Sequence, residues 1–252
     1  MKLERTLRRC LGAAALLLLA ACSRKPRAAS TELPPLEAKS WLVDLEVTGF
    51  GAARVAVPLG ARTPRPLAVA LHGDQDRPEW ACGSYRSAVG SKAFVLCPAG
   101  LPLSNERYGL LSSEHQTSEL RAALPALKAR FGKHLARGSI VLAALGPSAE
   151  TAFELALKEP SFFSYLILVD APLVRLDAAF AARFGAAGGR SVLVVCGEGA
   201  CDEGADQRVR TLLPAGVNAK LVRHPGRGLD ATAAATIAKE WSWLVAKDPR
   251  FR

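Results

Sequence analysis

The sequence is short of the features that mark several protein classes. Its 252 residues include four histidines, one methionine and 6% aromatic residues, and no segment repeats. The 50% hydrophobic and 22% charged content excludes a disordered chain, a collagen-like repeat and a protein with many membrane spans. The net charge is +10, but no basic residues alternate with aromatic residues as base-stacking surfaces require, so a nucleic-acid partner is not expected.

The first 21 residues combine a positive start with a short apolar stretch. Basic side chains precede residues 11–20, and ten apolar positions are too few to span a membrane stably as a helix. The stretch ends in Leu19-Ala20-Ala21-Cys22. This pattern resembles a bacterial lipoprotein signal peptide, which is cleaved before a cysteine that then receives lipid on its thiol and its new amino group.

The resemblance implies a lipoprotein signal peptide at 1–21 and fatty acyl chains such as palmitate on Cys22. Membrane attachment through several acyl chains is effectively permanent, which places the protein in the cell envelope. Ser23 in the second mature position implies the outer membrane, facing the periplasm or the cell surface. The alternative is an ordinary secretory signal followed by a chance cysteine.

Residues 22–40 are rich in proline, alanine and charge and have no apolar period, which predicts a lipidated flexible tether. Residues 41–252 then form one folded domain, large enough for a single core.

Four cysteines lie in that domain, and export places them where disulfides persist. Four cysteines allow three pairings. Because Cys97 and Cys196 each end a predicted strand and have a near neighbour in sequence, we expect the pairs Cys82–Cys97 and Cys196–Cys201. No histidine stands at ligand spacing from these cysteines, so we expect neither a metal nor a cofactor.

The order of apolar segments predicts an α/β domain. Residues 41–47 alternate between apolar and polar side chains, turn at 48–51 and return at 53–57 as an antiparallel hairpin. Continuous apolar runs follow and predict strands buried on both faces. These runs are 67–71, 93–97, 140–145, 165–169, 191–196 and 220–223.

Segments with the apolar period of a helix lie between and after these strands. Leu120, Leu124, Leu127 and Phe131 share one helix face that Pro125 kinks or restarts. Residues 237–244 form a similar face in a last helix that Asp230 caps and Pro249 closes. We therefore predict a three-layer α/β sandwich with a mostly parallel sheet and an N-terminal antiparallel hairpin.

Three segments carry a likeness to a known family. Leu71-His72-Gly73 follows the third strand, residues 140–160 give a strand, a sharp turn and a helix, and residues 166–170 give the next strand. Over about residues 41–246 this order resembles the α/β-hydrolase fold of esterases and dienelactone-hydrolase-like proteins. The resemblance implies an oxyanion or pocket role for His72 and Gly73 and a nucleophile elbow after residue 145.

Two alignments of the elbow compete. One places Ser148 at the nucleophile position of a G-x-S-x-G motif, with Glu150 replacing the last glycine. The other keeps the usual spacing to Pro160 and places Gly146 at the nucleophile position, where a positive φ suits glycine. In the second alignment, which we favour, Ser148 is a small residue packed beneath the turn.

The other triad positions are degenerate in the same way. Leu229 stands where the resemblance places the catalytic histidine, and leucine cannot accept a proton. His224 is a candidate for a displaced base, and Asp202 is a candidate for the acid that orients it. Trp80 follows the third strand and either walls a binding cleft or covers the sheet edge.

The sequence therefore predicts an envelope lipoprotein with a degenerate triad and a non-catalytic binding or structural role. Its partners would be the membrane, through Cys22, and a small molecule or an envelope component. The alternative is a carboxylic ester hydrolase that uses Ser148, His224 and Asp202. A third hypothesis is a protein with a filled pocket whose outer surface recruits a partner.

Overall fold

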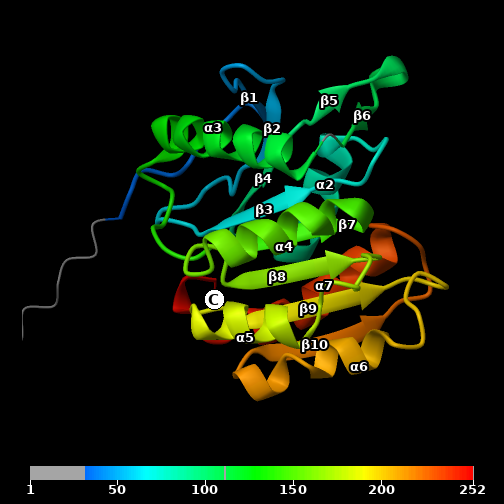
Figure 1. Ribbon diagram of the computed structural model, residues 1–252. Helices are drawn as coiled ribbons and strands as arrows, with labels where there is room; N and C mark the ends of the chain where they lie inside the picture. Colours follow the sequence, from blue (N-terminus) through cyan, green and yellow to red (C-terminus); the bar gives the residue numbers. More distant parts are fainter. Residues whose placement is uncertain (1–31, 111, 252) are drawn as a thin grey trace, which may run out of the picture. The chain divides into compact units, whose positions relative to one another are not determined.

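The computed structural model describes residues 32–110 and 112–251 (Figure 1). The proposed signal peptide, Cys22 and most of the predicted tether lie outside these residues. From Leu33 onward the chain forms one compact unit with its own core. Within the described ranges, no helix combines the length and the apolar character that a membrane span needs.

The unit is built on a mostly parallel sheet of eight strands in the order β1-β2-β4-β3-β7-β8-β9-β10. The first two strands form an antiparallel hairpin, β2 also runs antiparallel to β4, and the remaining neighbours are parallel. The strands are β1 (Leu42–Leu45), β2 (Ala53–Ala56), β3 (Leu67–Leu71), β4 (Phe94–Cys97), β7 (Val141–Leu145), β8 (Tyr165–Val169), β9 (Ser191–Cys196) and β10 (Asn218–Arg223).

Helices cover both faces of this sheet. Helices α3, α4, α5 and α6 pack on one face, and α2 and α7 pack against each other on the opposite face (Figure 1). The helices are α2 (Pro78–Val89), α3 (Ser113–Phe131), α4 (Ala149–Lys158), α5 (Ala178–Ala186), α6 (Ala205–Arg210) and α7 (Ala231–Leu244). Short 3₁₀ turns lie at η1 (Gly90–Lys92), η2 (Ser104–Glu106), η3 (Gly146–Ser148), η4 (Leu213–Ala215) and η5 (Pro249–Phe251).

The core explains why the central strands read as unbroken apolar runs. In β3, Leu67, Val69 and Leu71 enter the core beneath α3 and α4, whereas Ala68 and Ala70 enter the core beneath α2 and α7. Because both faces are covered, every side chain of β3 is buried. The predicted three-layer sandwich with an N-terminal hairpin is confirmed.

Two helix predictions can be compared with the structure. The carboxylate of Asp230 accepts hydrogen bonds from the backbone of Thr232 and Ala233 and thereby caps α7, as expected. Pro125 lies inside α3, which continues through it as one helix from Ser113 to Phe131. Leu120, Leu127 and Phe131 of the predicted face are buried, and Leu124 is half-buried.

Folded structure begins earlier than residue 41. The Leu33 amide donates to the Arg62 carbonyl, the Leu36 amide donates to the Ala61 carbonyl, and Leu36 is buried. The end of the segment assigned to the tether therefore packs on the domain, because Leu36 supplies an apolar side chain to the core.

Both expected disulfides are present, which confirms the predicted pairing. Cys82 in α2 bonds to Cys97 at the end of β4, with Cα atoms 5.9 Å apart. Cys196 at the end of β9 bonds to Cys201, with Cα atoms 5.7 Å apart. A small hairpin of β5 (Leu101–Pro102) and β6 (Tyr108–Gly109) was not predicted. It follows the end of β4 and lies at the edge of the sheet where β4 ends (Figure 1).

Candidate functional site

The positions singled out by the resemblance meet at the carboxyl edge of the parallel strands. Strand β3 ends before His72, β7 before Gly146, β9 before Gly197 and β10 before His224. The arrowheads of these strands point to one side of the sheet in Figure 1. Open α/β sheets bind their ligands at this edge, so the candidate site lies here.

Gly146 forms the turn from β7 into α4. Its φ of 58° is in the left-handed region that glycine adopts without strain, whereas Ser148 has φ −66°. A Cβ atom built on Gly146 meets no atom within 4 Å, so this backbone faces open space. The chain therefore turns at Gly146 and presents a bare backbone at the apex.

Pro147 follows that apex and changes the chemistry of the turn. In the elbow of α/β-hydrolases the oxyanion hole uses the backbone N–H of the residue after the nucleophile. Proline has no N–H. If Gly146 occupies the nucleophile position, Pro147 removes one of the two donors that stabilise an oxyanion. This consequence was not predicted, although Pro147 is visible in the sequence.

Ser148 lies beneath the turn. It is fully buried, and its hydroxyl accepts a hydrogen bond from the Leu145 amide at 3.1 Å. The same Oγ lies 2.9 Å from the Leu145 carbonyl oxygen and 3.3 Å from the Leu71 carbonyl oxygen. Its one proton is directed at backbone, so this hydroxyl ties β7 to the end of β3.

His72 is held by backbone on both sides of its ring. Nδ1 lies 2.7 Å from the Gly73 carbonyl oxygen, and Nε2 lies 2.8 Å from the Ala99 carbonyl oxygen. An imidazole with both nitrogens protonated donates to both, whereas a neutral ring donates to one. The ring is 3% exposed, so it connects the turn after β3 to the segment after β4.

Glu119 of α3 extends this connection and was not predicted. It is buried, and its carboxylate accepts hydrogen bonds from the Ala99 amide at 2.6 Å and from the Gly100 amide. Burial raises the pKa of Glu119 above its ordinary value, and these two hydrogen bonds partly offset that rise. The sequence gives no signal for this role, because the partners stand about 20 residues away.

No hydrogen bond or ion pair links Ser148, His224 and Asp202 within the described residues. The side chain of His224 is fully buried, and its Nδ1 lies 2.7 Å from the Thr232 hydroxyl, which in turn donates to Asp230. Asp202 instead forms an ion pair with Arg208, at 2.7 Å. The three side chains of the alternative catalytic set therefore have separate partners.

Leu229 stands in the loop after β10. It is half-buried, packs on the core beneath α2 and α7, and its carbonyl oxygen accepts a hydrogen bond from the Ser84 hydroxyl at 3.0 Å. The side chain at the position that the resemblance assigns to the catalytic histidine thus contributes to packing.

Asp170 is a second residue that sequence reasoning missed. It follows β8 with φ 46°, and its carboxylate accepts hydrogen bonds from the amides of Gly197 and Gly228, each at 2.6 Å. One side chain thereby joins the loops after β9 and β10. A non-glycine residue at positive φ beside a candidate site is held there by such contacts.

Trp80 lies at the start of α2 and contacts two arginines. The residue is 49% exposed, and the guanidinium groups of Arg77 and Arg107 lie 5.5 and 4.9 Å from the centre of its ring. Arg107 comes from the β5–β6 hairpin, so the indole connects the two loops. Trp80 therefore forms part of the exposed surface of this edge.

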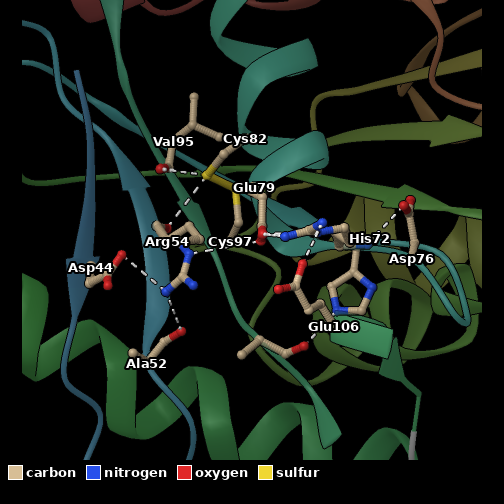
Figure 2. Close-up of polar contacts among 12 residues, drawn as sticks. Asp44, Ala52, Arg54, His72, Asp76, Glu79, Cys82, Val95, Cys97 and Glu106 are labelled. Atoms are coloured by element: carbon tan, nitrogen blue, oxygen red, sulfur yellow. Dashed lines mark hydrogen bonds and ion pairs between the residues drawn. A yellow bond between two sulfur atoms is a disulfide. The ribbon is translucent and has the colours of Figure 1, made fainter. Parts of the chain in front are cut away.

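An ion-pair network supports the base of α2. Figure 2 shows Arg54 of β2 beside Asp44 and Glu79, with the Cys82–Cys97 disulfide next to them. Arg54 lies 3.1 Å from Asp44, and Arg77 lies 2.7 Å from Glu79. Burial is the largest single influence and raises the pKa of Glu79, but a hydrogen bond from its own backbone amide, the hydrogen bond from Arg77 and the charges of Arg54 and Arg77 together lower that pKa below its ordinary value. Among residues 32–110 and 112–251, no three His, Cys, Asp or Glu side chains gather as metal ligands would.

Comparison with known proteins gives structural matches only. The sequence matches no protein-family model, and no curated protein matches it. An S-formylglutathione hydrolase from Agrobacterium tumefaciens matches with a TM-score of 0.58 at 15% identity, over 85% of this chain and 99% of that chain. An α/β serine hydrolase without a lid from Xanthomonas campestris gives 0.57 at 14% identity, over 85% and 97%.

A thermophilic esterase from Thermogutta terrifontis gives a TM-score of 0.50 at 16% identity, over 82% of this chain and 98% of that chain. The mostly parallel sheet of eight strands and the helices that flank it match the fold of these structures. The described domain therefore has the α/β-hydrolase fold.

Proposed function

We propose that this protein is a lipid-anchored protein of the cell envelope whose α/β-hydrolase domain does not hydrolyse esters and has a binding or structural role. The observation that carries the proposal is the turn after β7, where Gly146 at the apex is followed by Pro147. The esterase titles of the structural matches describe those proteins, and fold alone does not transfer an activity.

Ester hydrolysis by a serine triad needs three parts at this edge. A nucleophile attacks the carbonyl carbon, an imidazole takes its proton, and backbone amides stabilise the oxyanion. Glycine at the apex supplies no hydroxyl, Leu229 supplies no base, and Pro147 supplies no amide. Loss of all three is a stronger argument than loss of one, because a single missing member leaves residual catalysis by the others.

Ser148 is a poor substitute for the missing nucleophile. Its hydroxyl is buried and directed at the carbonyl oxygens of Leu145 and Leu71. His224 is fully buried against Thr232, and both ring nitrogens of His72 lie against backbone carbonyl oxygens, so neither imidazole is hydrogen-bonded to the Ser148 hydroxyl. This arrangement supports a non-catalytic role over the hydrolase alternative.

The anchor is proposed from the N-terminal pattern. Acylation of Cys22 after cleavage at Ala21 would hold the domain on the outer membrane, facing the periplasm or the cell surface. The two disulfides support export, because disulfides persist in oxidising compartments. A small molecule or an envelope component at the carboxyl edge would then be the partner.

Ester turnover tests the catalytic part of the proposal. The chain from residue 22 onward is incubated with short-chain nitrophenyl esters and, separately, with a fluorophosphonate that labels active serines. We expect hydrolysis at the background rate and no covalent label. Turnover that Ser148→Ala abolishes, in a variant that keeps its circular dichroism spectrum, would establish the hydrolase alternative.

Lipid attachment is tested separately in a bacterial host. The full chain should incorporate labelled palmitate and move to the detergent phase, and Cys22→Ala should do neither. If the host instead releases the unaltered protein without an acyl chain, the N-terminal segment is an ordinary secretory signal.

A further inference from the structure

The two edges of the sheet carry opposite charge. The segments that lead into the six parallel strands contain six basic residues and one acidic residue, Glu159. These segments are residues 57–66, 90–93, 132–140, 159–164, 187–190 and 211–217. The basic residues are Arg62, Arg65, Lys92, Lys133, Arg137 and Arg190.

The segments that leave the same strands have the reverse balance. Residues 72–77, 98–112, 146–148, 170–177, 197–204 and 224–230 contain nine acidic residues and four basic residues. The acidic residues are Asp74, Asp76, Glu106, Asp170, Asp177, Glu198, Asp202, Glu203 and Asp230. The basic residues are Arg77, Arg107, Arg175 and Arg227. The candidate site therefore lies at the acidic carboxyl edge, and the amino edge is basic.

The basic side chains of the amino edge are available to a partner. Arg62, Lys92, Lys133 and Arg137 are exposed, and none of them forms an ion pair within the described part of the chain. A groove of about 1280 Å³ opens beside Lys133, between residues 36–44 and 128–134. Four basic residues, Lys39, Lys128, Arg130 and Lys133, and two acidic residues, Glu37 and Asp44, line it, so its lining has a net positive charge.

The N-terminal segment joins the domain at this same basic edge. The Leu33 amide donates to the Arg62 carbonyl, and the Pro34 carbonyl oxygen lies 2.9 Å from His134 Nε2. Both partners belong to segments that lead into parallel strands, at the end of the sheet away from the arrowheads in Figure 1. The eleven residues 22–32 separate Cys22 from this attachment point. Even a fully extended chain of that length reaches at most about 40 Å.

We propose that the amino edge of the sheet lies on an anionic lipid surface, with Arg62, Lys92, Lys133 and Arg137 facing the headgroups and the candidate site facing away. The proposal rests on the anchor at Cys22, because that anchor keeps this edge near a bilayer. Each Lys or Arg near an anionic bilayer surface strengthens binding about fivefold. The acidic carboxyl edge is repelled by the same surface, which favours one orientation.

Vesicle binding by unlipidated protein tests this surface without the anchor. The chain from residue 22 with Cys22→Ser is mixed with vesicles of phosphatidylcholine alone or of phosphatidylcholine with phosphatidylglycerol, and bound protein is measured by sedimentation. We expect binding only to the vesicles that contain phosphatidylglycerol. Binding should weaken when salt is raised above about 0.1 M, where the Debye length is about 10 Å.

Matched charge reversals locate the edge. Lys133→Glu with Arg137→Glu should weaken binding to the anionic vesicles at least about tenfold. Arg175→Glu with Arg227→Glu makes the same change in net charge at the carboxyl edge and should leave binding within about twofold, since those residues lie in segments at the opposite edge of the sheet. Unfolding curves of both variants are compared with that of the unaltered chain, to check that neither variant has lost its folded structure.

Three results would overturn the proposal: equal binding to both kinds of vesicle, equal loss in both reversed pairs, or loss in the Arg175 and Arg227 pair alone. Because the assay uses neither the acyl anchor on Cys22 nor an ester substrate, its failure is distinct from a failure of the palmitate or turnover experiments.

Discussion

The Ser148 hydroxyl accepts a hydrogen bond from the amide of Leu145, the last residue of β7. The serine side chain thus supplies a hydrogen-bond acceptor for the last backbone amide of the strand before the turn. A side chain in this position stabilises the turn, and its hydroxyl donates towards the carbonyl oxygens of Leu145 and Leu71.

Ser148→Ala should lower the free energy of unfolding by about 1–3 kcal/mol, because the Leu145 amide loses its acceptor in a buried place. Urea unfolding followed by circular dichroism measures the change. Ser161→Ala, at an exposed serine, is the control and should change stability by less than about 0.5 kcal/mol. Equal values for the two variants would contradict a structural role for the buried hydroxyl.

Gly146→Ser should not create an esterase. The new hydroxyl would have space, but it would have no imidazole partner and no amide donor from Pro147. The left-handed backbone at this position should also cost about 1–3 kcal/mol of stability. Nitrophenyl ester turnover by the variant is compared with turnover by the unaltered chain. A clear increase would mean that a base and an oxyanion donor exist elsewhere at this edge.

Asp170→Ala should loosen two loops at once. The amides of Gly197 and Gly228 would lose their shared acceptor, at a cost of about 1–3 kcal/mol for each buried donor left unpaired. Hydrogen exchange should rise in residues 197–204 and 224–230 together. Asp170→Asn keeps one acceptor oxygen and tolerates positive φ, so it should give an intermediate result. Exchange that rises in one loop only would disprove the bridge.

The two disulfides should differ in their contribution to stability. The Cys82–Cys97 bond closes a loop of 15 residues and the Cys196–Cys201 bond a loop of 5. Chain entropy assigns about 3 kcal/mol to the first and about 2 kcal/mol to the second. Paired Cys→Ala variants, unfolded in urea, measure both values. A larger loss from the shorter loop would show that native packing, rather than loop closure, controls the effect.

Glu119 should make stability depend on pH. Its folded-state pKa lies above the ordinary value of 4.5, so the folded protein holds the proton more tightly than the unfolded chain. Its contribution is therefore present below about pH 4.5 and is lost as pH rises through the raised pKa. The free energies of unfolding of the unaltered chain and of Glu119→Gln are measured from pH 4 to about pH 8. Their difference isolates the contribution of Glu119 to the pH dependence of stability. A difference that is independent of pH would refute it.

Much of the sheet could be predicted because its side chains are buried on both faces. The apolar runs at 67–71, 165–169 and 191–196 coincide with β3, β8 and β9, and Asp230 caps α7 as its position suggested. The β5–β6 hairpin was missed, since strands of two residues have no period to detect. Helix α2 was also not predicted, because Gly83 and two serines weaken its helical pattern.

The candidate site was less accessible to sequence reasoning. Glu119 and Asp170 accept hydrogen bonds from amides 19 to 58 positions away, and only the folded chain brings those amides within reach. The roles of Gly146 and Pro147 depend on the residue at which the chain turns. The φ angle of Gly146 identifies that residue, whereas a sequence motif does not.

The position of Trp80 makes it a natural optical reporter of this edge. Its half-exposed indole is in contact with the guanidinium groups of Arg77 and Arg107, which come from different loops. A molecule that binds beside those loops and displaces an arginine from the ring, or covers the ring, changes the surroundings of the indole. Either event alters the environment that sets the emission wavelength of tryptophan, so occupancy can be followed without attaching a dye.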